Sequence, residues 1–130
     1  MLSFCLGLLF LIVPLLAPAS IAPYLAAPVW MGMVFLLDPL NYSWKRESLW
    51  RDWSRGDLGR LLRWFLAGLI AGFLWEFWNF WAATKWIYTV PILSDVKIFE
   101  MPVLGYLGFP AFALEIFVMW ETAKYLLRIR

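Results

Sequence analysis

The stretch that decides the fold is LGRLLRWFLAGLIAGFLWEFWNFWAA, which runs from Leu58 to Ala83. After its two arginines it continues from Trp64 to Ala83 with Glu76 as the only charged side chain. About 20 consecutive apolar residues are needed for a helix to cross the hydrocarbon core of a membrane. The stretch therefore predicts a transmembrane helix, and it raises the question of why a carboxyl group lies among so many aromatic rings.

The composition of the whole chain supports this prediction. Of its 130 residues, 64% are hydrophobic and 15% are charged, whereas soluble globular domains have about 45–50% apolar and about 25% charged residues. A chain this short cannot bury so much apolar surface in a core of its own. We expect an all-α, polytopic helical membrane protein that forms a single domain over residues 1–130.

Four apolar segments are expected to form helices. The first uncharged run is too long for one span, and the turn composition of PASIAP (18–23) divides it into two short helices. The expected helices cover residues 2–17, 21–37, 58–83 and 102–127, with an interfacial loop rich in Trp and Arg at 38–57. A re-entrant hairpin for the first two stays open. Cleavage of the first as a signal peptide is a weaker alternative, because no basic residue precedes it.

Three polar or proline positions carry local predictions. Asp38 and Asn41 have the composition of a turn after the second helix. Pro110 falls inside the fourth expected helix, where it should kink the helix or mark a local break. Glu121 is expected to be solvated, or to pair with Lys124 or Arg128.

The distribution of charge predicts the orientation. Four spans place most basic residues on one side, namely Lys45, Arg46, Arg51, Arg55, Arg60, Arg63, Lys124, Arg128 and Arg130. Lys85 and Lys97 fall on the other side. The positive-inside rule then makes both termini cytoplasmic, in a bacterial inner (cytoplasmic) membrane. Orientation and attraction to anionic lipids account for these residues, and with a net charge of +2 we expect no nucleic-acid partner.

Several classes of site are excluded by the absence of histidine and the presence of a single cysteine. An internal disulfide, a cysteine cluster, a His-ligated haem or zinc ion, and a His-dependent nucleophilic triad cannot form within this chain. A site made of carboxylates alone is the kind of metal site that the composition leaves, and we predict none. We expect no cofactor held by the chain's own ligands, while a bound lipid, isoprenoid or pigment stays open.

Two helix faces combine small and polar residues. On the third helix, Gly68, Gly72, Glu76 and Asn79 follow one another at helical spacing. Gly68 and Gly72 form the GxxxG pattern, which allows another helix to approach closely. The fourth helix has a related face, made of Gly105, Gly108, Ala111, Glu115 and Thr122. If these two faces pack together, Glu76, Asn79 and Glu115 converge inside the bilayer.

A carboxyl group inside a bilayer is costly unless it is protonated, paired with a cation or next to a water-filled cavity. A neutral acid can donate a proton, so Glu76 and Glu115, with Asn79 beside them, are the candidate catalytic residues. The alternative, which we favour slightly, is that they hold the helices together by hydrogen bonds. The candidate residues for contact with a ligand or partner are Gly68, Gly72, Trp75, Trp78 and Gly108.

Two resemblances add to this reading. The motifs WEFWN, FEMP and GFP resemble a pattern found in a family of small, uncharacterised bacterial integral membrane proteins. Over about a third of the chain, Trp75-Glu76, Trp86-Ile87-Tyr88 and residues 110–117 are similar to elements of the membrane-embedded lycopene cyclase domains. The paired acidic core of those domains is absent, and only Glu115 in ALEIF corresponds to it. This resemblance implies acid-initiated cyclisation through carbocations.

Three functions follow from these observations. The first is a small accessory or assembly subunit of a larger membrane complex, packing through its small-residue faces on other subunits or on itself and contacting lipid or apolar cofactors with its aromatic rings. The second is a cofactor-independent membrane enzyme that acts on an isoprenoid or lipid through its glutamates. The third is a proton-coupled carrier, which ranks last because no pore-like ring of charge is present.

Overall fold

The computed structural model describes residues 1–89 and 91–129 and is built mainly from helices. The long helices are α1 (Leu2–Leu16), α2 (Ala26–Ser43), α4 (Gly59–Trp81) and α5 (Gly108–Leu126), and the short α3 (Leu49–Ser54) lies between α2 and α4. The 3₁₀ turns η1 (Ala22–Leu25) and η2 (Val103–Leu107) lead into α2 and α5. Strands β1 (Lys97–Ile98) and β2 (Met101–Pro102) form a small antiparallel hairpin before η2.

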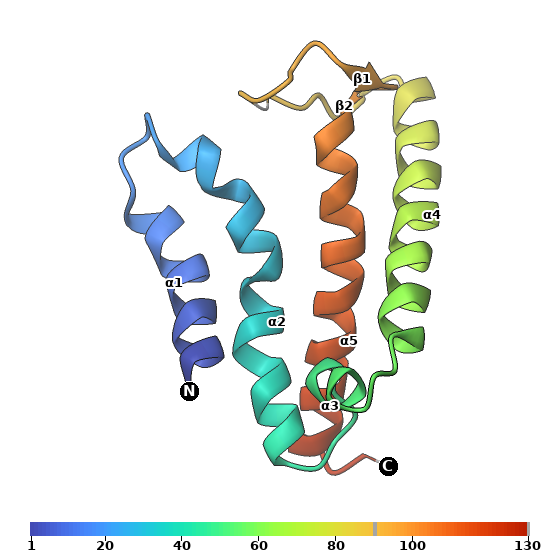
Figure 1. The fold of residues 1–130 in the computed structure, drawn as a ribbon. Helices are drawn as coiled ribbons and strands as arrows, with labels where there is room; N and C mark the ends of the chain where they lie inside the picture. The colour runs from blue at the N-terminus through green and yellow to red at the C-terminus, as the bar shows by residue number, and fades with distance from the viewer. Residues whose placement is uncertain (90, 130) are drawn as a thin grey trace.

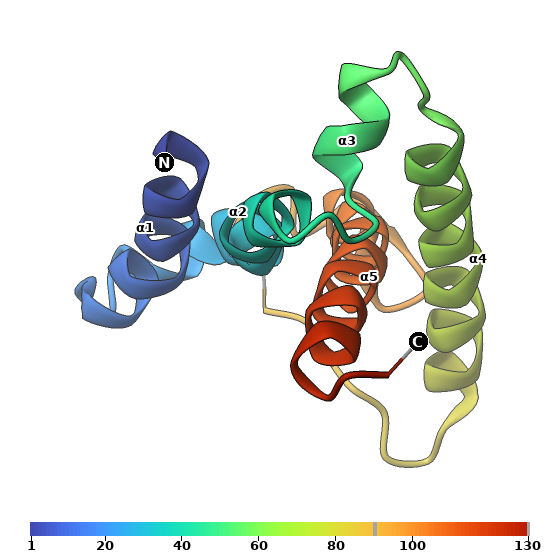
Figure 2. The same ribbon diagram turned by 90° about the horizontal axis from the view of Figure 1, so that it is seen from below.

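The long helices lie side by side in the order α1, α2, α5, α4 (Figures 1 and 2). α1 packs on α2, while α2 and α4 both pack on α5. The N-terminus, α3 and the last turn of α5 lie at one end, here named the α3 end (Figure 1). The β1–β2 hairpin lies at the opposite end, here named the hairpin end. Because α5 runs between α2 and α4, these two helices are separated along one face of the molecule.

Within the described residues, three helical segments are long and apolar enough to cross a membrane: Ala22–Ser43, Gly59–Trp81 and Val103–Leu126. This agrees with an all-α membrane protein. The first apolar helix, α1, has 15 residues and is shorter than these. A fourth crossing by α1 therefore stays a prediction, as does the re-entrant hairpin.

The second helix begins and ends later than the sequence suggested. α2 continues to Ser43, so Asp38 and Asn41 lie inside a helix and the prediction of a turn there was wrong. Pro39 has no N–H to donate to the carbonyl of Phe35, four residues earlier. The hydroxyl of Ser3, on α1, donates to that carbonyl instead, at 3.0 Å. A neighbouring helix thus supplies the partner that the proline removes.

The region around Pro110 differs from the expected single helix. η2 precedes α5, and the change from 3₁₀ to α-helix occurs at Gly108. Pro110 therefore lies in the first turn of α5, where its missing N–H breaks no helical hydrogen bond. The local break predicted there is present, just before the proline rather than at it.

The basic residues divide between the two ends as the sequence predicted. Those around α3 and at the end of α5 lie at the α3 end, while Lys85 and Lys97 lie at the hairpin end. Glu121 is buried, with 4% of its surface exposed. It pairs with Lys124 at 2.6 Å and with Arg46 at 3.7 Å, so the predicted pairing with Lys124 is confirmed and solvation is wrong. Arg130 lies outside the described residues.

The core lies between α2 and α5. Val34, Leu114, Phe117 and Val118 form its buried apolar cluster. Next to it, the fully buried Asn41 side chain donates to the carbonyl of Val118 at 2.9 Å and accepts from the hydroxyl of Thr122 at 3.0 Å. A buried amide is tolerated when its donor and acceptor are both used, so this pair of bonds fixes α2 to α5.

The contact between α4 and α5 depends on the GxxxG pattern. A methyl group added at Gly68 would lie 2.6 Å from Pro110 Cα and 2.7 Å from the Phe109 carbonyl oxygen. One added at Gly72 would overlap the Phe109 ring. The two backbones therefore approach as closely as they do because both positions lack a side chain.

We expect Gly68→Ala to force α4 away from α5 and to destabilise the protein by about 1–3 kcal/mol, as overpacking does. Gly59→Ala, at the start of the same helix, is the matched control, because a methyl group there would meet only the flexible side chains of Asp57 and Arg63. The measurement is thermal unfolding in a mild detergent. Equal stability of the two variants would contradict the close packing at Gly68.

Candidate functional site

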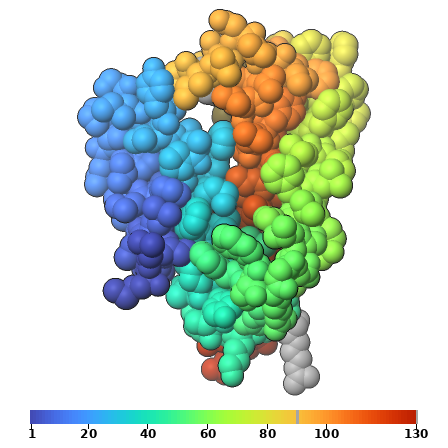
Figure 3. Space-filling view, in the orientation of Figure 1, coloured from blue at the N-terminus to red at the C-terminus, as the bar shows by residue number. Residues whose placement is uncertain are grey.

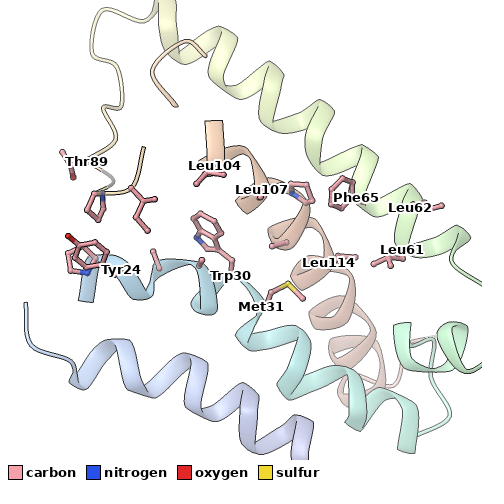
Figure 4. Close-up of a pocket in the computed structure, with 18 residues that line it drawn as sticks. Tyr24, Trp30, Met31, Leu61, Leu62, Phe65, Thr89, Leu104, Leu107 and Leu114 are labelled. Atoms are coloured by element: carbon pink, nitrogen blue, oxygen red, sulfur yellow. The ribbon is translucent and has the colours of Figure 1, made fainter. Parts of the chain in front are cut away.

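An apolar groove lies between α2 and α4, against η2 and the first half of α5 (Figure 4). Its volume is about 880 Å³, and the molecule is hollowed there in the space-filling view (Figure 3). From η1 and α2 it is lined by Pro23, Tyr24, Ala26, Ala27, Trp30 and Met31, and from α4 by Leu61, Leu62 and Phe65. Leu104, Gly105, Leu107, Pro110, Ala111 and Leu114 line it from η2 and α5, and Thr89, Pro91 and Ile92 close it at the hairpin end.

Small side chains keep the groove open. Ala26 and Ala27 face it from α2, and Gly105 and Ala111 from the opposite wall. Between them the indole of Trp30 projects into the groove (Figure 4). The ring can lie there because the wall behind it is Gly108, where a methyl group would come within 3.1 Å of the indole. On the walls formed by α2 and by η2 with α5, the Trp30 ring therefore lies among residues that have little or no side chain.

A second pocket continues the groove toward the α3 end. This cavity, here named the α3 pocket, has a volume of about 420 Å³ and lies between α3 and the bundle. Met31, Leu61 and Leu114, one residue from each long helix around it, line both the groove and this pocket. In contrast to the groove, the α3 pocket has carboxyl groups in its lining, together with Trp50 and Trp53.

Asp38 fixes α3 over this second pocket. Its buried carboxylate accepts hydrogen bonds from the N–H groups of Leu49 and Trp50, at 2.9 and 2.8 Å, and from the Ser48 hydroxyl at 3.0 Å. Ser48 in turn accepts from the N–H of Arg51 at 3.3 Å. A negative group at a helix N-terminus satisfies its free N–H groups and opposes the helix dipole. All three hydrogen bonds that the Asp38 carboxylate accepts therefore hold the start of α3.

Glu76 is fully buried near the hairpin end of α4 and bonds to a residue of the following loop. The phenolic hydroxyl of Tyr88 donates to Glu76 Oε1, while Oε2 has no hydrogen-bond partner among the described residues. Burial raises the pKa of the Tyr88 phenol above its ordinary value, and its hydrogen bond to the carboxylate raises the pKa further. The pair links a helix to the segment that closes the groove.

Asn79 and Lys85 hold the same segment. The Asn79 side chain donates to the carbonyl of Trp86 at 2.8 Å and accepts from its N–H at 2.6 Å. Lys85 forms an ion pair with Glu100, in the turn between β1 and β2. Residues 84–89 with 91–92 are here named the strap. Side chains of the helix and the hairpin thus tie the strap down, and its far part covers the groove.

The two candidate catalytic glutamates are not brought together. Gly68 of α4 lies opposite Pro110 of α5, and the two helices run in opposite directions (Figure 1). Glu76 lies eight residues beyond Gly68 toward the hairpin end, and Glu115 lies five residues beyond Pro110 toward the α3 end. At about 1.5 Å per residue, the two glutamates are separated by about 20 Å along the helix axes. Glu115 is half-buried toward α2, where its Oε1 accepts from the N–H of Met33 at 3.3 Å. The condition for Glu76, Asn79 and Glu115 to converge, namely that the two small-residue faces pack together, is therefore not met.

The reason lies in the faces of α5. Its predicted small and polar face turns toward α2, as the contacts of Gly108 with Trp30, Glu115 with Met33 and Thr122 with Asn41 show. The Gly68–Gly72 face of α4 instead meets Phe109 and Pro110. Both small-residue faces are thus used inside the chain, against different neighbours.

Trp75 and Trp78 lie on the outer face of α4, with 59% and 69% of their surface exposed. Neither lines the groove or the α3 pocket. Neither lines a third pocket, which lies beside α4 and is lined by Leu69, Ile70, Phe73, Leu74, Ile98, Val103 and Tyr106. They are available for contact with lipid or a partner. Across residues 1–89 and 91–129, no group of three or more acidic or cysteine side chains is placed to hold a metal ion.

The residues of the groove were mostly missed at the sequence level. Gly105 and Ala111 were noted as small, but their role was assigned to helix packing. The sequence gave no indication that Ala26, Ala27 and Trp30 line a groove, because small residues beside a tryptophan are ordinary in an apolar helix. A groove is a gap between helices, so the periodicity of any one helix does not identify the residues that line it.

Comparison with known proteins adds no relative: no protein-family model, no curated protein and no solved structure matches this chain. The resemblance to small bacterial membrane proteins and to lycopene cyclase domains therefore stays a hypothesis that rests on the motifs alone.

Tyr88→Phe removes the hydrogen-bond donor to the buried Glu76 carboxyl, and we expect it to cost about 1–3 kcal/mol. Glu76→Leu removes the acceptor for the phenol, and when Glu76→Leu is already present the Tyr88→Phe change should cost less. Thermal unfolding of the two single variants and the double variant forms the cycle that measures this coupling. Strictly additive effects would mean that the two side chains do not interact.

The raised pKa of Tyr88 also predicts a dependence on alkaline pH. The folded protein holds the phenolic proton more tightly than the unfolded chain, whose tyrosine titrates near 10.0. The stabilisation is complete below that pH and is lost as the pH rises above it. The Tm of the wild type should therefore fall more steeply above pH 10.0 than that of Tyr88→Phe, which lacks the phenolic proton. Parallel curves would contradict this.

Proposed function

We propose that this protein is a small accessory subunit of a membrane assembly and that it holds one apolar, chain-like molecule, a lipid acyl chain or an isoprenoid, in the groove between α2 and α4. The observation that carries the proposal is the groove itself. Its volume of about 880 Å³ falls in the range of ligand sites, about 300–1,000 Å³, and such sites are lined mainly by apolar and aromatic groups.

The closure of the groove favours a chain-like molecule over a helix of a partner protein. Thr89, Pro91 and Ile92 line its hairpin end, where the chain runs across the bundle from α4 toward α2 (Figures 1 and 2), and the strap that carries them is tied down through Asn79 and Glu76. A helix with its side chains is about 10–12 Å across and would have to pass this cover to span a bilayer. A flexible hydrocarbon chain can end beneath it.

The position of the carboxyl groups favours binding over catalysis. Neither Glu76 nor Glu115 is among the residues that line the groove. A general acid must come within hydrogen-bond reach of the atom that it protonates. Glu76 is bonded to the strap and Glu115 to α2, so the enzyme and the proton-coupled carrier have less support than a binding subunit.

The accessory role rests on the outer face of α4. Trp75, Trp78 and Trp81 are exposed there, which gives the chain a broad aromatic surface for membrane lipids, another subunit or a second copy of itself. Because the basic residues gather at the α3 end, the positive-inside rule favours a cytoplasmic location for that end and for both termini. The proposed location is the bacterial inner membrane.

The test is to identify what the purified protein carries. We expect organic extraction and mass spectrometry to find one apolar molecule enriched over the bulk lipid of the same preparation. Ala27→Phe should reduce this enrichment roughly tenfold or more, because a phenyl ring added to an exposed wall of the groove occupies the space of the ligand.

Ala67→Phe is the matched control, because Ala67 is an exposed alanine of α4 that lines none of the three described pockets. It should retain the wild-type enrichment. Extraction of bulk lipid alone from the wild type, or equal enrichment in all three proteins, would refute the groove as a binding site.

A further inference from the structure

We infer that the groove and the α3 pocket form one continuous site for a single elongated amphiphile, whose polar end lies at α3 and whose apolar end lies beneath the strap. This inference rests on the proposed function and adds the orientation of the ligand and the chemistry of its polar end.

The two cavities adjoin at a shared wall. Met31 of α2, Leu61 of α4 and Leu114 of α5 line both of them, so a chain that extends from one cavity into the other passes along these three side chains. Along α2, Ala26 lines the groove and Asp38 lines the α3 pocket. Twelve helical positions correspond to about 18 Å, which makes the combined site long and narrow rather than round.

The two ends of this site differ in polarity. The groove contains no charged side chain in its lining, and Pro91 and Ile92 cover its end. The polar side-chain groups of its lining are the hydroxyls of Tyr24 and Thr89 and the indole N–H of Trp30, so a charged group placed there would find no partner of opposite charge. The α3 pocket contains Asp52 and Asp57 in its lining and lies next to the exposed polar segment around α3. The polar end of the ligand therefore belongs at α3.

The carboxylates of the α3 pocket also favour one kind of polar end. Asp57 is exposed, and one of its oxygens accepts from the N–H of Gly59 at 2.7 Å, which leaves the other for a ligand. Asp38 is occupied by α3, and Asp52 pairs with Arg60 at 3.0 Å. No Lys or Arg lines the pocket. A hydroxyl or amine can donate to Asp57, whereas a phosphate would meet like charge.

Tryptophan fluorescence can read the orientation, because Trp30 marks the groove and Trp50 and Trp53 mark the α3 pocket. The probes are hexadecanol brominated either next to the hydroxyl carbon or at the far end, added to the full chain in detergent. Bromine quenches nearby indoles. Quenching of Ala27→Phe by the same probe defines the non-specific part, which is subtracted.

We expect the tail-brominated alcohol to quench a component that is absent from Trp30→Phe and retained in the double variant Trp50→Phe/Trp53→Phe. The head-brominated alcohol should give the opposite pattern. Hexadecyl phosphate should compete with either probe at least roughly tenfold more weakly than unlabelled hexadecanol, because like charge opposes its binding.

The outcomes separate this inference from the proposal on which it rests. The reverse quenching pattern, or phosphate competition as strong as that of the alcohol, would overturn the inference while leaving a ligand in the groove. Quenching by both probes with no loss in Trp30→Phe would place the ligand in the α3 pocket alone and would also overturn it. If neither probe quenches the wild type beyond Ala27→Phe, the groove is not a ligand site and the proposed function fails as well.

Discussion

The contact on which the rest of the structure depends is the close approach of α4 to the start of α5 at Gly68. The missing side chain allows the backbone of α4 to lie directly against Phe109 and Pro110. On its other side α5 is bonded to α2 through Asn41 and Thr122. Because two different faces of α5 are occupied in this way, α2 and α4 stand apart, and the groove is the space that remains between them.

The buried and half-buried polar side chains of this protein mainly hold its segments together by hydrogen bonds. Asp38 holds α3, and Asn79 and Glu76 hold the strap. Ser3 supplies the donor that Pro39 lacks. These bonds meet a requirement that is strict in apolar surroundings, namely that a buried donor or acceptor finds a partner; Oε2 of Glu76 is the exception among them, with no partner among the described residues. The polar side chains are thereby concentrated at the ends of the bundle, and the wall of the groove consists of hydrocarbon and aromatic surface. This division is the physical basis for proposing a binding subunit rather than an acid catalyst.

The limits of the sequence are clearest at Glu76 and Glu115. The helical spacing correctly placed Gly68, Gly72 and Glu76 on one buried face of α4. It also grouped Gly108, Glu115 and Thr122 on one face of α5, and these do share a neighbour. That neighbour is α2 and not α4, because the periodicity of a helix indicates which residues face together but not which helix they face. The convergence of the two carboxyl groups depended on that second piece of information.

The sequence by itself determined the helical character of the chain, the approximate position of each long helix, the end at which the basic residues gather and the exclusion of histidine- and cysteine-based chemistry. These follow from composition, spacing and chain length, which are local properties. The tertiary structure alone decided that α2 extends through Pro39, that the glutamates lie far apart and that Ala26, Ala27, Trp30 and Ala111 line one groove. These depend on contacts between segments distant in the chain. A helix is one continuous segment with its own periodicity, whereas a groove is lined by residues from several separate segments.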